Sequence, residues 1–195
     1  MFVEIFILCL LAYLCGSIPF GMLIAKTQNI DIRKHGSGNI GATNVTRIIG
    51  KKLGFITLIG DVLKGWVIVF LAFHWFEKPI LIALAGFMVF FGHLYSIFLR
   101  FKGGKGVATY LGILFALNIY FSLIFIISWF VTFGLSKYSS LASLVASISI
   151  PIYLLFSSQF NQVIFFTIMF ILIFFTHREN IKRLKNKEET KTKIY

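Results

Sequence analysis

The sequence predicts an all-α, polytopic membrane helix bundle. Of its 195 residues, 58% are hydrophobic and only 13% are charged, and the mean hydropathy is +0.88. A soluble domain of this length has no core large enough to bury so much apolar surface. With 24 phenylalanines and 3 prolines, the chain is neither disordered nor collagen-like. The remaining class is a protein whose apolar helices face lipid.

The net charge of +12 comes from basic residues that are grouped between the apolar stretches and at the C-terminal end. Sixteen of the 19 lysines and arginines lie in three clusters, within residues 26–52, 100–105 and 178–193. Such grouping is typical of the cytoplasmic side of a membrane protein, so no nucleic-acid partner is expected. The predicted topology has the N-terminus outside and a short basic cytoplasmic tail from about residue 178.

The first apolar stretch, residues 2–25, is predicted to be a retained membrane helix. Glu4 stands where a secretion signal would carry a basic residue. Pro19 predicts a kink in this helix, because proline interrupts helical hydrogen bonding. Its small neighbours Gly16, Ser17 and Gly21 indicate close packing against another helix.

Further apolar stretches follow at residues 53–76, 79–99, 107–135, 141–156 and 160–176. The stretch 107–135 is either one tilted span or two helices that turn near Asn118, since a crossing needs about 20 residues. If all basic clusters share one side and the N-terminus lies on the other, the number of spans is odd. Splitting 107–135 gives seven spans, which we predict; fusing the last two stretches instead gives five.

Two ionisable residues, Asp61 and Lys64, interrupt the stretch 53–76. Spaced three apart, they share one face of a helix, and each would cost about 2.5–3.5 kcal/mol if it were unpaired in the membrane. We interpret them as a mutually neutralising pair that faces the protein interior. The alternative is that they support a polar site.

The first basic connection, residues 31–47, combines glycines, hydroxyls, amides and cations. Glycines let backbone N–H groups converge on an anion, hydroxyls add donors, and an arginine holds a phosphate in fork geometry. These residues are Gly36, Gly38, Gly41, Ser37, Thr43 and Arg47. The G-x-G-x-x-G spacing within them is no dinucleotide fingerprint, because no strand precedes it. A flexible polar loop is the alternative.

The second connection, residues 101–109, repeats this chemistry before an apolar helix. Three glycines allow close approach, two lysines bring charge, and the helix start offers free N–H groups. The residues are Lys102, Gly103, Gly104, Lys105 and Gly106. It is not a Walker A loop, which needs a Ser or Thr directly after its Gly-Lys pair. Binding of acidic lipid head groups is the alternative.

The third polar segment follows the last apolar stretch and places His177 and Asn180 three residues apart, in position to contact one ligand together. Ordinary interfacial residues are the alternative. No metal or cofactor is expected, because the cysteines and carboxylates form no cluster with the four histidines, which are scattered as His35, His74, His93 and His177.

Together these segments resemble the integral-membrane acyl-phosphate:glycerol-3-phosphate acyltransferases of bacteria, the PlsY type. The resemblance spans essentially the whole chain. It rests on GSIPFG at 16–21, GSGNIGATNVTR at 36–47, DVLKG at 61–65, GH at 92–93, FKGGKGVAT at 101–109 and HRENIKRL at 177–184. The chain lacks the proline that the family usually has before the glycine-lysine loop, which leaves the local geometry there open.

The resemblance implies a single membrane domain, residues 1–195, in the bacterial cell membrane with its site at the cytoplasmic face. It implies transfer of a fatty acyl group from acyl phosphate to the 1-hydroxyl of glycerol 3-phosphate, giving lysophosphatidic acid and phosphate. The implied partners are these two substrates, membrane lipid and a soluble enzyme that forms acyl phosphate.

The resemblance also implies roles for individual residues. The implied catalytic residues are Ser37, Arg47, Lys105, His177 and Asn180. The implied substrate-binding residues are Gly38, Asn39, Gly41, Thr43, Asn44, Lys102, Gly103, Gly104 and Gly106. Ser37, Gly38, Asn39, Thr43 and Asn44 would line the acyl phosphate, and Arg47, Lys105, His177 and Asn180 would hold glycerol 3-phosphate.

No histidine has an aspartate five positions later, so the sequence predicts no His-Asp base of the soluble acyltransferase type. Positioning and electrostatic stabilisation suffice for a mixed anhydride with a good leaving group. The alternative function is a transporter or flippase for an organic phosphate. A transporter would have its site near the membrane midplane and related halves, whereas these candidates gather on one face and the chain has no repeat.

Overall fold

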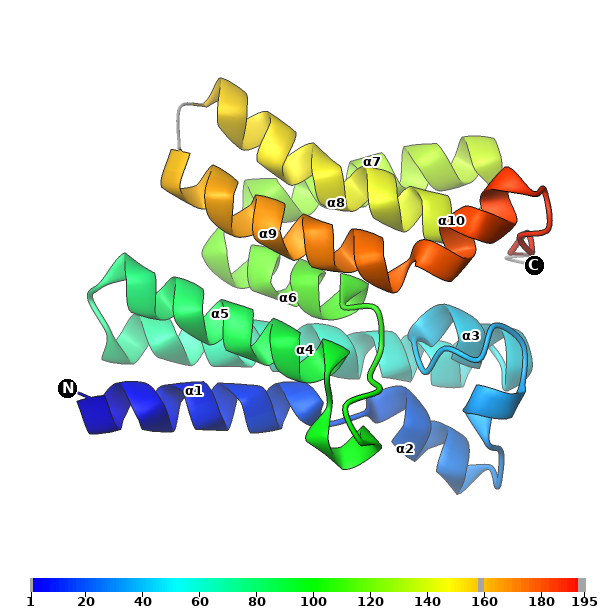
Figure 1. Ribbon diagram of the computed structural model, residues 1–195, viewed down its shortest axis with the longest axis horizontal. Coiled ribbons are helices and arrows are strands. Elements are labelled where there is room, and N and C mark those ends of the chain that lie inside the picture. The colour runs from blue at the N-terminus through cyan, green and yellow to red at the C-terminus, as the bar shows by residue number, and fades with distance from the viewer. Residues whose placement is uncertain (1, 158–159, 193–195) are drawn as a thin grey trace. The chain divides into compact units, whose positions relative to one another are not determined.

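The computed structural model describes residues 2–157 and 160–192, and this part of the chain is helical without a strand (Figure 1). The predicted all-α class is therefore confirmed. Lys193 of the predicted tail lies outside the described residues. The chain forms two compact units that meet in sequence at Leu117 and Asn118, and each unit is described by itself.

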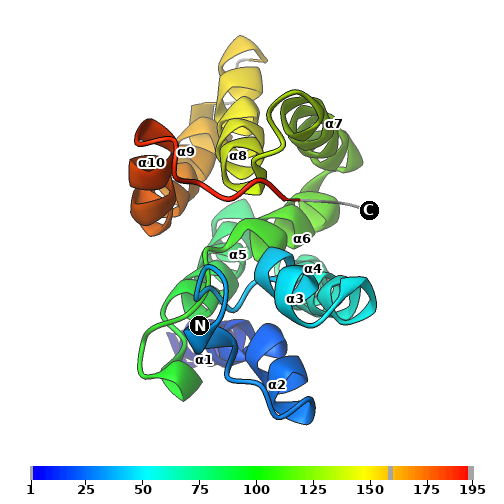
Figure 2. The same ribbon diagram turned by 90° about the vertical axis from the view of Figure 1, so that its right-hand side faces the viewer.

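The first unit contains four longer helices with shorter elements between them. Helix α5 lies against both α1 and α4, α6 packs along α4, and α3 lies against the start of α4 (Figures 1 and 2). The elements are α1 Phe2–Ser17, α2 Phe20–Thr27, the 3-10 helix η1 Ile32–Lys34, α3 Ala42–Ile48, α4 Lys51–Trp75, α5 Pro79–Leu94, the 3-10 helix η2 Ile97–Leu99 and α6 Val107–Leu117.

Reciprocal glycines let the helices of the first unit approach closely. Gly16 of α1 faces the backbone of α5, and Gly92 of α5 faces the backbone of α1. Gly65 of α4 and Gly112 of α6 repeat the arrangement. At all four positions a Cβ atom would overlap a backbone carbonyl oxygen of the partner helix. Small residues are what membrane helices need for such contact, and the predicted close packing at Gly16 is confirmed.

The first membrane segment is broken at the predicted proline. Helix α1 ends at Ser17 and α2 begins at Phe20, with Pro19 between them. The carbonyl oxygens at the break find donors elsewhere in the unit: Ser96 Oγ donates to Ser17 O at 2.5 Å, and Lys64 Nζ donates to Ile18 O at 2.9 Å. The break is thus a stable feature, since its buried carbonyl groups are satisfied.

The second unit is a helical layer in which α8 lies between α7 and α9 (Figure 2). Its elements are α7 Ile119–Ser136, α8 Ser139–Phe156, α9 Phe160–Thr176 and α10 Arg178–Lys185. The tail returns toward the α7–α8 turn, where Thr192 N donates to Lys137 O at 3.0 Å.

The turn expected near Asn118 is confirmed. Helix α6 ends at Leu117, and the Asn118 side chain caps α7 by accepting a hydrogen bond from Tyr120 N at 2.8 Å. By length and composition, five helical segments within residues 2–157 and 160–192 are able to cross a membrane, or six if the bent pair α9–α10 counts as one span. Helix α6, with 11 residues, is shorter than a normal span. The count of seven spans stays a prediction.

Glycine packing between α4 and α6 gives the first prediction. We expect Gly112→Ala to lower the free energy of unfolding by about 1–3 kcal/mol, because the added Cβ overlaps Val62 O. The matched control is Gly134→Ala in α7, where a Cβ meets nothing within 4 Å. Thermal unfolding in detergent measures both variants. Equal midpoints for the two would contradict the close packing.

Candidate active site

The first basic loop takes its shape from two glycines in the left-handed region. Gly36 has a φ of +59° and Gly38 a φ of +70°, conformations that favour glycine. Gly41, by contrast, is extended with a φ of −75° and precedes α3. The left-handed turns of this loop thus come from Gly36 and Gly38, while Gly41 directly precedes α3. The nest expected from the three glycines stays a prediction.

Asn44 holds this loop together from inside. Its Oδ1 accepts a hydrogen bond from Ser37 N at 2.9 Å, and its Nδ2 donates to Asn39 O at 2.9 Å and to His35 O at 3.1 Å. The side chain is buried. The polar groups of Asn44 thus bind the backbone of the loop. Contact between Asn44 and a substrate stays a prediction.

The second half of the first connection is a helix, α3, rather than a loop. This differs from the sequence interpretation, which treated residues 31–47 as one connection. Val45 is fully buried in a cluster with Ala25, Ile32 and Ile40, so packing stabilises a short helix of low propensity. Thr43 and Arg47 are four residues apart on α3 and share a face. Arg47 is exposed and Thr43 is half-buried, as is Asn39 in the loop; Ser37 is exposed.

The second basic loop is pinned to the end of α5. Gly103 N donates to Leu94 O at 2.9 Å, and Gly104 N donates to His93 O at 3.0 Å. Before it, Arg100 and Phe101 make the turn with left-handed φ angles of 54° and 61°. The loop then presents Lys102 exposed and Lys105 half-buried, with Gly106 at a φ of +86° before α6.

The two basic loops meet in the first unit. Arg33 Nη2 donates a hydrogen bond to the carbonyl oxygen of Lys102. Leu99 of η2 also packs against the apolar cluster that contains Ile32 and Val45. The structure therefore brings together two of the three predicted anion-binding segments.

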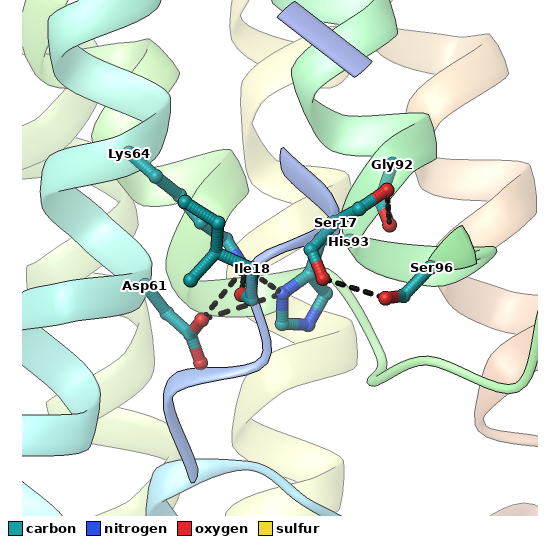
Figure 3. A network of polar contacts seen from close by, with 7 residues as sticks. All are labelled: Ser17, Ile18, Asp61, Lys64, Gly92, His93 and Ser96. Atoms are coloured by element: carbon teal, nitrogen blue, oxygen red, sulfur yellow. Dashed lines mark hydrogen bonds and ion pairs between the residues drawn. The ribbon is translucent and has the colours of Figure 1, made fainter. Parts of the chain in front are cut away.

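A buried polar network joins α4, α5 and the break between α1 and α2 (Figure 3). Lys64 Nζ is 2.8 Å from Asp61 Oδ1, which confirms the predicted interior ion pair. Lys64 Nζ also lies 2.8 Å from His93 Nδ1. Sequence reasoning missed the place of His93 in this network, because the contact joins α4 to α5 and no local spacing reveals it.

The third predicted segment belongs to the second unit. His177 sits where the axis bends by 61° between α9 and α10, and Asn180 lies in the first turn of α10. Both side chains are buried. The ring atom Nδ1 of His177 is 2.8 Å from Ile173 O, so Nδ1–H donates to this carbonyl.

Asn180 is held by a carboxylate that sequence reasoning missed. The Glu189 carboxylate accepts hydrogen bonds of 2.7 Å each from Asn180 Nδ2, Ser140 Oγ and Arg183 Nε. Partial burial alone would raise the pKa of Glu189, but these three donors and the charge of Arg183 outweigh it and hold the pKa below its ordinary value. The contact depends on the tail folding back, which no short-range pattern indicates.

A metal centre has no ligand set in the part of the chain that is described. Across residues 2–157 and 160–192, no three His, Cys, Asp or Glu side chains gather where they could hold a metal ion.

Comparison with known proteins identifies the family. The model of the glycerol-3-phosphate acyltransferase family matches residues 6–187, which include all three polar segments. The chain is 56% identical over 193 residues to the glycerol-3-phosphate acyltransferase of Pelagibacter ubique (strain HTCC1062), covering 98% of this chain and 100% of that protein. The chain belongs to the glycerol-3-phosphate acyltransferase family, PlsY type.

Other family members agree. A Brucella suis (strain ATCC 23445 / NCTC 10510) glycerol-3-phosphate acyltransferase is 48% identical over 92% of this chain and 89% of its own. The crystal structure of PlsY, an integral membrane glycerol 3-phosphate acyltransferase, in its glycerol 3-phosphate form has a TM-score of 0.93 and 40% identity, covering 96% of this chain and 95% of that one. Its lysophosphatidic acid form has a TM-score of 0.90 and 39% identity, with the same coverage.

The Glu189 contacts predict a pH dependence for this acyltransferase family member. A carboxylate whose pKa is lowered in the folded state stabilises that state. The stabilisation is complete at pH values above the ordinary pKa of 4.5, and it is lost as the pH falls through the lowered pKa. We expect Glu189→Gln to lower the unfolding midpoint at neutral pH and to differ less from the native chain below pH 4.5.

The control for this prediction is Glu188→Gln, which changes the exposed neighbouring carboxylate. Unfolding midpoints of the three proteins across the acid range provide the measurement. A Glu189→Gln difference that stays constant with pH would rule out the role of the carboxylate charge.

Proposed function

We propose that this protein transfers a fatty acyl group from acyl phosphate to the 1-hydroxyl of sn-glycerol 3-phosphate, forming lysophosphatidic acid and phosphate, as a step of phospholipid biosynthesis. The observation that carries the proposal is the 40% identity over 96% of the chain to PlsY, whose crystal structures include a glycerol 3-phosphate form and a lysophosphatidic acid form. The two linked basic loops of the first unit support it, since both substrates and one product carry phosphate.

The proposed reaction balances without a cofactor. The 1-hydroxyl oxygen forms a bond with the carbonyl carbon of acyl phosphate, and the bond from that carbon to the phosphate oxygen breaks. The hydroxyl proton passes to an oxygen of a substrate phosphate. The chain's contribution is to hold two anions together and to stabilise the charge that develops on the carbonyl oxygen.

We propose different sets of residues for the two substrates. Ser37, Gly38, Asn39 and Thr43 are proposed to line acyl phosphate, with Asn44 shaping the loop that carries three of them. The cations Arg47 and Lys105, with His177 and Asn180, are proposed to hold glycerol 3-phosphate. Five further residues are proposed to let the backbone approach the substrate phosphates: Gly41, Lys102, Gly103, Gly104 and Gly106.

The proposed setting is the bacterial cell membrane. We place the N-terminus outside and the basic tail in the cytoplasm, with α6 and α9 adding to the five longer spans to make seven. The reaction then takes place at the cytoplasmic face, where a soluble enzyme supplies acyl phosphate and the product enters the lipid phase. No observation favours the transporter alternative over an acyltransferase.

The direct test is an assay of purified protein in detergent with glycerol 3-phosphate and either acyl phosphate or acyl coenzyme A. We expect lysophosphatidic acid and an equal amount of phosphate from acyl phosphate alone. Product from acyl coenzyme A alone would overturn the proposed donor. No product from either donor, in protein that still binds glycerol 3-phosphate, would favour the transporter.

The same assay tests the two cations. Arg47→Ala and Lys105→Ala are each expected to lower kcat/KM by about 10²–10³-fold, the usual loss when one electrostatic donor is removed from a reacting centre. Lys78→Ala is the matched control, because Lys78 is an exposed cation that precedes α5. Near-normal turnover in both site variants would contradict the assigned roles.

A further inference from the structure

The ammonium of Lys64 is buried together with the carboxylate of Asp61 (Figure 3). An ammonium has three N–H donors and no acceptor. Lys64 Nζ donates to Ile18 O at 2.9 Å and lies 2.8 Å from His93 Nδ1, and it forms an ion pair with Asp61 Oδ1 at 2.8 Å. The ammonium thus has three partners within the first unit.

This arrangement fixes the tautomer of His93. Because Lys64 only donates, His93 Nδ1 must accept, and the neutral ring carries its proton on Nε2. Asp61 Oδ1 is 3.5 Å from His93 Nδ1, on the side that Lys64 already occupies. A histidine base would instead donate Nδ1–H to its carboxylate. The geometry therefore assigns His93 a different task from proton transfer.

The other edge of the ring touches the glycine-lysine loop. A Cβ on Gly104 would overlap His93 Nε2, so the ring lies directly against the Gly104 backbone. The carbonyl oxygen of His93 accepts the hydrogen bond from Gly104 N at 3.0 Å. His93 thus contacts the same loop residue with its ring and its backbone, one position before Lys105.

We propose that His93 is a positioning residue for Lys105: held by Lys64, Asp61 and the broken first helix, its ring sets the backbone of the glycine-lysine loop and so the place of the Lys105 ammonium. This inference rests on the proposed function, in which Lys105 holds the phosphate of glycerol 3-phosphate. It extends the candidate site from the glycine-lysine loop to the ion pair of Asp61 and Lys64 in α4.

The test uses His93→Asn, Gly104→Ala and the double variant. The Asn amide oxygen replaces Nδ1 as the acceptor for Lys64, but the ring edge under Gly104 is lost. We expect KM for glycerol 3-phosphate to rise about tenfold, with an unfolding midpoint close to that of the native chain, since small misplacements at a site are costly. Gly104→Ala pushes on the ring from the loop side and is expected to raise KM similarly.

The double variant separates positioning from general damage. Removing the ring makes room for the Ala methyl, so we expect its KM to lie closer to the native value than that of Gly104→Ala. His74→Asn is the matched control, because His74 lies in the last turn of α4 and contacts Phe70 O of its own helix at 3.0 Å. It is expected to leave KM unchanged.

Two results would overturn the proposal: a native KM in folded His93→Asn, or multiplicative KM increases in the double variant. If His93→Asn fails to fold, a native KM in Gly104→Ala overturns it. Stabilisation by glycerol 3-phosphate in thermal unfolding gives a second reading that needs no acyl donor. A protein that binds glycerol 3-phosphate but rejects acyl phosphate refutes the proposed function and leaves this test intact.

Discussion

Backbone carbonyl groups inside an apolar helical unit need donors, and the break at Pro19 frees two of them in the first membrane segment. Ser96 and Lys64 supply the hydrogen bonds to Ser17 O and Ile18 O. The donor group of Lys64 is a positively charged ammonium. A charge inside an apolar helical unit is tolerated only when it is paired with an opposite charge. The break therefore explains why α4 carries both a cation and Asp61 within its apolar sequence.

The same constraint leads to the candidate site. Lys64 also donates to His93 at the end of α5, and the backbone of His93 receives the glycine-lysine loop. Reciprocal glycines at Gly16 and Gly92 bring α1 and α5 close together, and Ser96, just after α5, donates to Ser17 O at the end of α1. The loops of the proposed site are thus held in place by the buried helices of the first unit. Loops that carry function on a rigid scaffold are the usual arrangement in enzymes.

Much of the fold follows from short-range sequence signals. Hydropathy locates the long helices to within a few residues, Pro19 marks the break and Asn118 marks the turn into α7. The spacing of Asp61 and Lys64 predicts their pairing. These features depend on residues near each other in the chain, so the sequence contains what is needed to predict them.

Other features depend on contacts between distant segments. Helix α3 forms because Val45 packs on Ile32, although its own residues are poor helix formers. Asn44 has the chemistry of a ligand donor and is instead used by its own loop. Glu189 reaches Asn180 only through the folded tail. Amide and carboxylate groups serve structure and binding equally well, so residue type alone does not separate the two roles.

The central claim, that a paired Lys64 holds the broken first segment to α4 and α5, is tested most directly by a double-mutant cycle with Asp61. Unfolding in mixed micelles, followed by tryptophan fluorescence, gives the free energies of unfolding. We expect Lys64→Met to cost about 3–5 kcal/mol, because Asp61 is left as an unpaired buried charge. Adding Asp61→Asn should recover a large part of this loss. Independent, additive losses in the double variant would contradict the account.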